Sequence, residues 1–430
     1  MLHFGIFAFL GVFTMYKLYK KDNIMKVDIF GAISNLFFSS DNKPKADNSY
    51  FGNTDNGIIH ASVNLNNIPQ AHYVMSDIQS GKKYPNHKES NYRACLLGGA
   101  IGDALGAPVE FMRLSEIRNM YGRDGIVDLE TPNGKAYITD DTQMTIFTAD
   151  GLIKSSLHSS FSDKKDEMEQ VYGSYQNWLN TQRHSGFKVG GNGWITGISA
   201  LYARRAPGLT CTGSLKNNIP GSIENPVNSS KGCGGVMRVA PAGLKYYKDS
   251  KKAFDVGARC AALTHGSPDA YLPAGIHSCI IANLIQGKSL DESVDIAMEI
   301  LKEYDDHENV LNLMKKAIKY AHSDIKSDDA IRNLGEGWHG DEAMAIALYC
   351  VLKSPDDFEN AIILSVNHDG DSDSTGAIVG NIMGAYLGED AIPDKWKNSV
   401  ELASELKLLA HDLYVNPSEI KNSKERYPSF

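Results

Sequence analysis

Paired cysteines are the first feature that the sequence lacks. Its six cysteines are scattered over 430 residues, and no two of them stand in a C-x-x-C arrangement. Zinc fingers and thioredoxin-like redox sites require cysteines at such close spacing, so the sequence disfavours both classes. Most of the six occur in apolar surroundings, which is typical of buried, reduced thiols. We therefore expect a protein of a reducing compartment and predict a cytoplasmic location.

Positive charge is in deficit as well. The chain has 43 Lys and Arg against 52 Asp and Glu, which gives a formal net charge of −9. Proteins whose main partner is nucleic acid neutralise its phosphates with Lys and Arg, so no nucleic-acid partner is expected. A local basic pocket for a phosphorylated small molecule remains compatible with this balance.

The alternating apolar pattern of β-strands is nearly absent. Apolar residues recur instead at helical spacing. The predicted helices cover residues 93–106, a segment directly after Asp141, and residues 167–182, 194–205, 253–263, 271–286, 290–304, 308–322, 341–353, 357–366 and 375–387. Since 42% of the residues are hydrophobic, a substantial core is available. The sequence therefore predicts an all-α fold.

The first residues form an apolar run, 2–15, that is shorter than the ~20 residues a membrane-spanning helix needs. No Lys or Arg precedes the run and no clear cleavage site follows it, so it is a poor secretory signal. Three interpretations stay open for residues 1–24. They are a short membrane anchor, an amphipathic segment, and an upstream translation outside the working protein, with Met25 as a later start.

Composition divides the rest of the chain. Residues 38–91 are rich in Asn, Ser, Asp and Lys and lack periodic apolar residues, so we predict a polar, poorly ordered linker over 25–91. Organised structure begins near Tyr92. We expect a single folded domain over 92–415 and a C-terminal tail over 416–430.

Two of the predicted helices carry a glycine at every fourth position. These glycines are at 98, 102 and 106 in one helix and at 376, 380, 384 and 388 in and after the other. Glycine costs about 1 kcal/mol in a helix interior relative to alanine, so such a ridge needs a packing reason. A dinucleotide-binding turn is disfavoured, because no strand precedes residues 93–106 and the spacing is not G-x-G-x-x-G. We predict that the two glycine helices cross near a functional site.

The second glycine helix is preceded by an acidic cluster. Asp369, Asp371 and Asp373 alternate within residues 367–376, and oxygen ligands of this kind suit hard divalent cations. A calcium-binding EF-hand loop is excluded, because its sixth position requires Gly and its twelfth requires Glu, where this chain has Ser374 and Gly380. A turn that only caps the helix is the alternative, and capping and metal binding can coexist.

A second acidic cluster, Thr139-Asp140-Asp141, stands directly before another predicted helix. One carboxylate would suffice as a helix cap, and two adjacent carboxylates repel each other. A cation would relieve this repulsion. The cluster can therefore supply the ligands that residues 369–374 lack.

Other candidate residues give weaker signals. A glycine-rich turn at 232–235 leads into a short helix and could present backbone N–H groups to phosphate. His265 lies in a turn between helices, and Glu110 follows the helix that ends near Pro108. The long loop 206–231 has the length of a functional or a disordered loop.

Five segments together resemble the ADP-ribosylglycohydrolase family, in the same order along residues 92–415. They are Gly-Asp-Ala-Leu-Gly-Ala-Pro-Val-Glu (102–110), Thr-Asp-Asp-Thr-Gln-Met-Thr (139–145), Gly-Cys-Gly-Gly-Val-Met-Arg-Val-Ala-Pro (232–241), Leu-Thr-His-Gly (263–266) and Asn-His-Asp-Gly-Asp-Ser-Asp-Ser-Thr-Gly (367–376). The resemblance implies an all-α orthogonal multi-helix bundle with a central cleft that holds two Mg²⁺, or Mn²⁺ in some relatives.

The resemblance also implies roles for individual residues. The expected metal ligands are Thr139, Asp140, Asp141, Asp371, Asp373 and Ser374. Glu110 and Asp371 match catalytic positions. Gly232, Gly234 and Gly235 match a loop that wraps a diphosphate, with Cys233 where some relatives have Asn, and His265 matches a position of the substrate pocket.

We therefore expect a metal-dependent hydrolase that removes ADP-ribose from a modified acceptor, above all ADP-ribosyl-arginine on protein, by attack of water at the anomeric carbon of the ribose. Such a reaction passes through an oxocarbenium-like state and needs an activated water, and two cations held by carboxylates can orient the sugar and activate that water. The expected partner is an ADP-ribosylated protein or another ADP-ribose conjugate. Two alternatives stay open: a two-metal phosphohydrolase of ADP-ribose or nucleotides, and a non-catalytic ADP-ribose-binding relative.

Overall fold

The computed structural model describes residues 4–9, 12–21, 24–29, 87–159, 167–183 and 193–428. It separates into two units, residues 1–83 and 84–430. In the first unit, strands β1 (Phe4–Phe9), β2 (Val12–Lys21) and β3 (Ile24–Ile29) form an antiparallel sheet in the order β1-β2-β3. Residues 24–29, most of which we placed in the linker, are therefore part of a sheet. The remainder of the predicted linker up to residue 86 lies outside the described residues, and the roles considered for residues 1–24 stay predictions.

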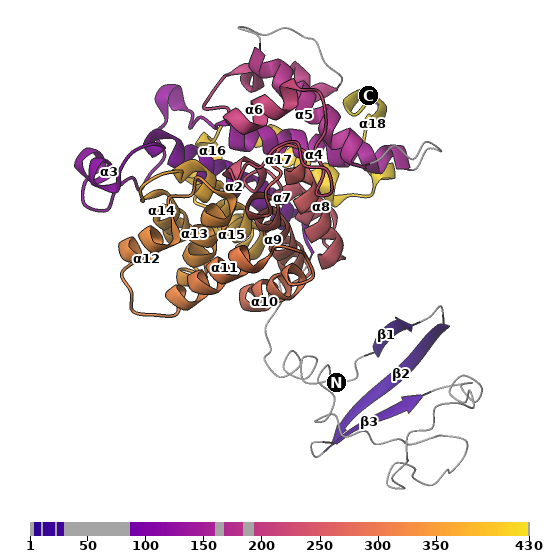
Figure 1. Cartoon of the computed structure of the whole chain (residues 1–430). Helices are drawn as coiled ribbons and strands as arrows, with labels where there is room; N and C mark the ends of the chain where they lie inside the picture. Colours follow the sequence, from indigo (N-terminus) through magenta and orange to yellow (C-terminus); the bar gives the residue numbers. More distant parts are fainter. Residues whose placement is uncertain are drawn as a thin grey trace, which may run out of the picture. The chain divides into compact units, whose positions relative to one another are not determined.

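The second unit is helical throughout its described part, apart from two isolated β-bridges (Figure 1). Its α-helices are α2 (Glu89–Gly106), α3 (Leu114–Tyr121), α4 (Asp140–Ser159), α5 (Glu167–Arg183), α6 (Leu209–Lys216), α7 (Ala240–Lys245), α8 (Ser250–Ala262), α9 (Pro268–Ile285), α10 (Leu290–Leu301), α11 (Glu308–Ala321), α12 (Ser327–Leu334), α13 (Gly340–Lys353), α14 (Phe358–Val366), α15 (Ser372–Leu387), α16 (Asp394–Ser399), α17 (Ala403–Tyr414) and α18 (Ser423–Arg426). The predicted all-α fold of this domain is confirmed.

Two local predictions were wrong. The predicted helix 194–205 is a pair of short 3₁₀ turns, Trp194–Gly197 and Ser199–Tyr202. Its sequence explains the failure, because glycine and β-branched residues at 195–198 are poor helix formers. The predicted loop 206–231 contains the short helix α6.

Helices α2 and α15 pack backbone against backbone through the glycines noted in the sequence. A Cβ atom added at Gly98 would come 2.2 Å from the carbonyl oxygen of Gly380, and one added at Gly102 would come 1.9 Å from that of Gly376. Likewise, a Cβ atom added at Gly106 would come 2.4 Å from the carbonyl oxygen of Ser372. Residue numbers rise along one helix as they fall along the other, so the pair is antiparallel. The C-terminal end of α2 therefore meets the N-terminal end of α15, and the predicted packing role of the glycines is confirmed.

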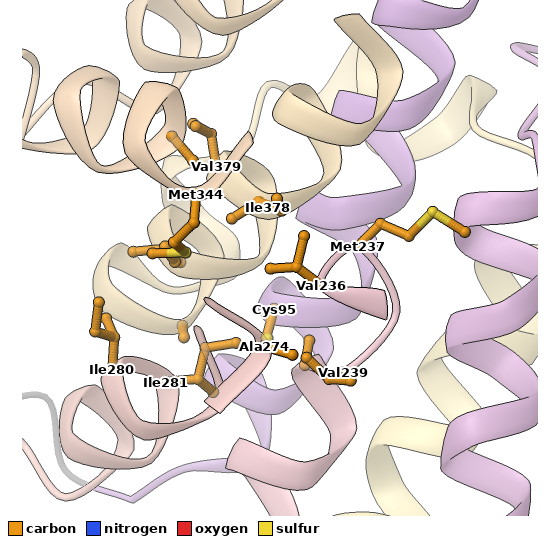
Figure 2. Packing of buried hydrophobic residues seen from close by; sticks show 14 of the residues in the cluster. Cys95, Val236, Met237, Val239, Ala274, Ile280, Ile281, Met344, Ile378 and Val379 are labelled. Carbon is orange, nitrogen blue, oxygen red and sulfur yellow. The ribbon is translucent and has the colours of Figure 1, made fainter. Parts of the chain in front are cut away.

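Helix α9 lies at the centre of the second unit. Its side chains are buried on all sides, as expected for a helix that is apolar around its whole circumference. The hydroxyl of Ser267 accepts a hydrogen bond from the backbone N–H of Asp269, with Pro268 in the first turn. Figure 2 shows Val236 and Val239, from the segment after the glycine-rich turn, in the same buried cluster as the side chains of α9. The turn is thus anchored to the core.

Both ends of the second unit join this core. The C-terminal tail contains α18, and the buried Tyr427 donates a hydrogen bond of 2.5 Å to Asp412 on α17.

In the described part of the chain no single helix is long and apolar enough to cross a membrane. The bent pair Glu89–Val109 and Leu114–Tyr121 meets the length and composition of a span when its two helices are taken together.

The glycine contact predicts an asymmetric effect of added methyl groups. Gly380→Ala should lower the free energy of unfolding by about 1–3 kcal/mol, because its Cβ would lie 1.9 Å from the carbonyl oxygen of Gly98 and force α2 and α15 apart. Gly213→Ala is the matched control, because it lies inside α6 with nothing within 4 Å of its Cβ position. It should stabilise the protein by up to about 1 kcal/mol. Urea unfolding measures the free energy of unfolding of both variants. Equal changes in this free energy for the two variants would contradict the packing argument.

Candidate active site

A cleft of about 520 Å³ opens where α2, α4 and α15 meet. Its lining consists of the acidic residues singled out above, the glycine-rich turn, one histidine and an apolar rim. The lining residues are Glu110, Phe111, Asp140, Asp141, Ala206, Pro207, Gly208, Leu209, Thr210, Cys211, Gly232, Cys233, Gly234, Met237, His265, Trp338, Asp371, Asp373 and Ser374. Of the residues predicted for the site, only Thr139 and Gly235 do not line the cleft.

The start of α15 contributes one half of the acidic cluster. One carboxylate oxygen from each of Glu110, Asp371 and Asp373 lies within 4.8 Å of the other two. Asp371 is also the N-cap of α15, since its side chain accepts a hydrogen bond from the backbone N–H of Ser374. Glu110 reaches this group because the antiparallel packing brings the end of α2 to the start of α15. Capping and clustering coexist at Asp371.

The start of α4 contributes the other half. Both carboxylate oxygens of Asp141 lie 3.0 Å from the hydroxyl of Ser374, which donates a hydrogen bond to them. The carboxylate of Asp140 accepts a hydrogen bond of 3.1 Å from the backbone N–H of Gly208. The structure therefore joins the two acidic segments that the sequence separates by more than 200 residues. Thr139 is buried beside them, and its hydroxyl accepts a hydrogen bond of 3.3 Å from the N–H of Asp141.

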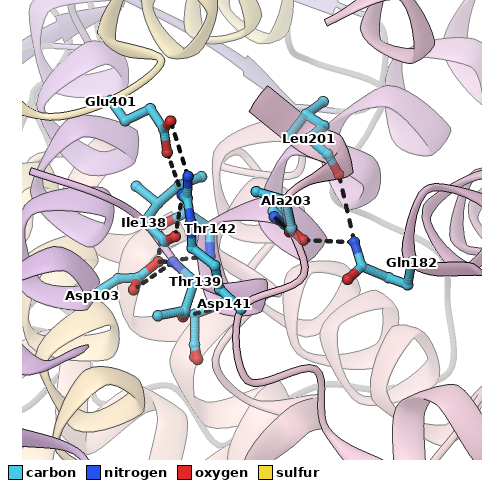
Figure 3. Close-up of polar contacts among 11 residues, drawn as sticks. Asp103, Ile138, Thr139, Asp141, Thr142, Gln182, Leu201, Ala203 and Glu401 are labelled. Atoms are coloured by element: carbon cyan, nitrogen blue, oxygen red, sulfur yellow. Dashed lines mark hydrogen bonds and ion pairs between the residues drawn. The ribbon is translucent and has the colours of Figure 1, made fainter. Parts of the chain in front are cut away.

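Asp103 of α2 performs the capping that the sequence suggested for the acidic pair. Its carboxylate accepts hydrogen bonds from the backbone N–H of Thr139 at 3.0 Å and from that of Thr142 at 3.1 Å (Figure 3). The hydroxyl of Thr142 donates a further bond, at 2.5 Å. Because Asp103 satisfies the start of α4, Asp140 and Asp141 are left to face the cleft. The one charged side chain in the apolar stretch 94–106 was the available sequence signal for this role.

Burial and mutual repulsion disfavour ionisation of the acidic cluster. Burial, followed by the neighbouring Asp373 and Asp140 carboxylates, raises the pKa of Glu110 to about 10. The same two causes hold the pKa values of Asp141 and Asp373 well above their usual range. No Lys or Arg lines the cleft in the described part of the chain. Carboxylate and hydroxyl oxygens with excess negative charge are the donor set that fits a hard divalent cation.

The glycine-rich turn lines the cleft beside these acids. A Cβ atom at Gly234 would lie 2.8 Å from the sulfur of Cys211 and 3.1 Å from the ring of His265, so the turn fits closely against both residues. Gly235 instead packs against Ala261 of α8, at 2.8 Å. The thiol of Cys233 donates a hydrogen bond of 2.7 Å to Asp371. The turn therefore touches the acidic cluster directly.

An aromatic pair at the cleft, Phe111 and Trp338, was not predicted from the sequence. Phe111 is 70% exposed, with a backbone φ of 68°, and its ring stacks on that of Trp338 at 5.3 Å between centroids. A bulky residue with positive φ is unusual, and such strain concentrates at functional sites. No pattern in the sequence marks Phe111, since its exposure depends on the turn that follows Glu110.

Asp369, which is not among the expected metal ligands, does not line the cleft. Its carboxylate accepts a hydrogen bond of 2.7 Å from the backbone N–H of Leu114, at the start of α3. The amide of Asn367 likewise holds the loop at Ile126, through bonds of 2.9 and 2.8 Å. The segment 367–374 therefore anchors neighbouring loops with its first residues and lines the cleft with its last.

Comparison with known proteins agrees with this arrangement. The family model described as ADP-ribosylglycohydrolase matches residues 85–421. The chain belongs to the ADP-ribosylglycohydrolase family. The resemblance drawn from the five segments is thereby confirmed, as is the prediction that the chain is a glycohydrolase enzyme. Enzymes of this family are generally metal-dependent, which accords with the acidic cluster.

Individual relatives are distant but match about three quarters of the chain. The ADP-ribosylhydrolase ARH3 of Mus musculus is 27% identical over 363 residues, 76% of this chain and 91% of the relative. The ADP-ribosylarginine hydrolase Tri1 of Serratia proteamaculans is 24% identical over 330 residues, 76% of this chain and 80% of the relative. A solved structure titled ADP-ribosylglycohydrolase-related protein complex has 21% identity and a TM-score of 0.49, covering 76% of this chain and 98% of that one.

The raised pKa values predict how stability depends on pH in the presence of a chelator. The pKa of Glu110 rises on folding from its ordinary 4.5 to about 10, so the folded state binds more protons than the unfolded state across this range. Stability should therefore fall as the pH rises from about 5 to about 9, by an amount on the order of 2 kcal/mol. Glu110→Gln should flatten the dependence and be more stable than wild type at the alkaline end.

Urea unfolding at several pH values would measure this effect. Glu308→Gln is the control, because Glu308 is exposed in the first turn of α11, and it should follow the wild-type profile. A wild-type stability that rises with pH over this range would contradict the argument.

Proposed function

We propose that the chain removes ADP-ribose from a modified arginine side chain of a protein, with the help of two divalent cations, Mg²⁺ or Mn²⁺. The observation that carries the proposal is the meeting of five carboxylates from three segments in one cleft, with no cationic side chain of the described residues beside them. Family membership supports the reaction class. Relatives named ADP-ribosylarginine hydrolase favour arginine as the acceptor.

The cations would be held by residues from the starts of two helices. Asp140 and Asp141 of α4, Asp371 at the cap of α15, and Asp373 and Ser374 in its first turn provide oxygen donors that fit them, and Thr139 is the sixth proposed ligand. When bound, such cations orient the ribose hydroxyls and lower the pKa of an attacking water. They would also relieve the repulsion among the carboxylates.

Glu110 is the proposed general base, in the ionised form that bound cations would favour by offsetting the neighbouring negative charges that raise its pKa. As the bond between the anomeric carbon and the guanidine nitrogen breaks, positive charge develops on the ribose and the carboxylate of Asp371 stabilises it. The oxygen of one water bonds to the anomeric carbon as the C–N bond breaks, and Glu110 accepts a proton from that water. The same proton then passes to the departing guanidine nitrogen, which regenerates the Glu110 carboxylate. The products are ADP-ribose and unmodified arginine. The glycine-rich turn and His265 are the proposed contacts for the diphosphate.

Hydrolysis of ADP-ribosyl-arginine on a protein tests this proposal. Wild type with Mg²⁺ should release ADP-ribose, and a chelator should abolish the release. The double variant Asp141→Asn, Asp371→Asn should lose activity by roughly 100-fold or more, because it removes a carboxylate from each half of the cluster. Asp369→Asn is the matched control, since this aspartate lies in the same segment but holds α3. It should retain activity.

Mass spectrometry of the products separates the alternatives. Activity that survives the chelator or the double substitution would contradict the metal-dependent mechanism. Release of AMP instead of intact ADP-ribose would indicate a phosphohydrolase. Preferential release from serine or from an O-acetyl linkage would contradict arginine as the acceptor.

A further inference from the structure

Arg238 is a buried cation that has no carboxylate partner among the described residues. It follows the glycine-rich turn and is 0% exposed. Its guanidinium lies 4.3 Å from the centre of the Tyr175 ring and donates hydrogen bonds to the carbonyl of Cys260 at 3.1 Å and to the hydroxyl of Thr264 at 2.7 Å. Burial of a charge without a counter-charge is costly, so the position requires a reason beyond packing.

The hydroxyl of Thr264 connects this cation to His265. A guanidinium can only donate, so the Thr264 oxygen accepts the bond from Arg238. Its single proton then has two acceptors within reach, the carbonyl of Ala261 at 3.4 Å and Nδ1 of His265 at 2.8 Å. The guanidinium polarises the hydroxyl and strengthens it as a donor, and the shorter contact is with the ring nitrogen. Nδ1 is therefore the acceptor.

The other ring nitrogen of His265 faces the cleft. The side chain is 1% exposed and lines the cleft beside the glycine-rich turn, where a Cβ atom at Gly232 would lie 3.4 Å from Nε2. Among the described residues Nε2 has no hydrogen-bond partner. Burial, and then the charge of Arg238, lower the pKa of His265 to about 3, so the ring is neutral and carries one proton. With Nδ1 accepting, this proton is on Nε2.

We propose that Arg238 and Thr264 are positioning residues that hold His265 in its Nε2–H tautomer, so that the ring donates a hydrogen bond to a phosphate oxygen of a nucleoside diphosphate. The choice of this anion rests on the proposed function, whereas the tautomer rests on the hydrogen bonds alone. The opposite tautomer would turn a lone pair toward the anion and repel it. A neutral donor of this kind binds phosphate without needing protonation.

His277 provides an internal reference of opposite tautomer. Its Nδ1 lies 3.0 Å from the backbone carbonyl of Val236, which can only accept, so His277 carries its proton on Nδ1. Nitrogen-15 NMR of the full chain with labelled histidine should show an Nε2–H ring for His265 and an Nδ1–H ring for His277. The substitutions His265→Gln and His277→Gln assign the two signals. An Nδ1–H ring at His265 would overturn the proposal.

We call the chain of hydrogen bonds from Arg238 through Thr264 to His265 the relay. Thr264→Val and Thr264→Ser test its function. The Val variant keeps the shape and removes the hydroxyl, so His265 loses its fixed tautomer and the dissociation constant for ADP-ribose should rise about tenfold. The Ser variant keeps the hydroxyl and should bind and show the tautomer as wild type does. Thermal unfolding without ligand shows that both variants are folded. Equal ADP-ribose affinity of the Val and Ser variants would contradict the relay.

The two proposals fail in different ways. Wild type that binds ADP-ribose but does not cleave ADP-ribosyl-arginine would contradict the proposed function and leave the relay intact. Wild type that cleaves the substrate, together with a Val variant whose His265 is still Nε2–H, would contradict the positioning role of Thr264 alone.

Discussion

Direct contact between the backbones of α2 and α15 is the constraint on which the cleft depends. The two helices approach so closely that a single methyl group at Gly102 or Gly376 would overlap the opposite backbone. This contact fixes the distance between the two helices and also their relative position along the helix axes. It sets the end of α2 beside the start of α15, and Glu110, four residues beyond α2, therefore lies next to Asp371 and Asp373. Larger side chains would separate these carboxylates.

The same rigidity allows the protein to concentrate like charges. Five carboxylates share the cleft, and burial raises their pKa values because water cannot solvate their charge. Such an arrangement destabilises the metal-free fold and prepares it for a cation. Asp103 makes it feasible at α4, since one fully buried carboxylate satisfies the helix start and leaves Asp140 and Asp141 for the cleft.

The surroundings of His265 differ in charge from those of the acidic cluster. Arg238 brings a positive charge to within one hydroxyl group of His265, while the ring itself remains neutral. The acids come largely from the starts of α4 and α15, whereas this buried cation lies in the turn that precedes α7. A substrate with an anionic diphosphate and a ribose that becomes positive during cleavage matches this polarity, which is consistent with the proposed function.

The helical class, the two glycine ridges and the acidic segments could be predicted from local sequence patterns, because helical periodicity, four-residue spacing and adjacent carboxylates are properties of short stretches. Which of these groups meet depends on how the helices pack. Asp103, Arg238 and the Phe111–Trp338 pair act through partners far along the chain or through a turn with positive φ, and no local pattern encodes such contacts. The helix predicted at 194–205 was wrong because residues 195–198 are poor helix formers, and the loop predicted at 206–231 contains the short helix α6.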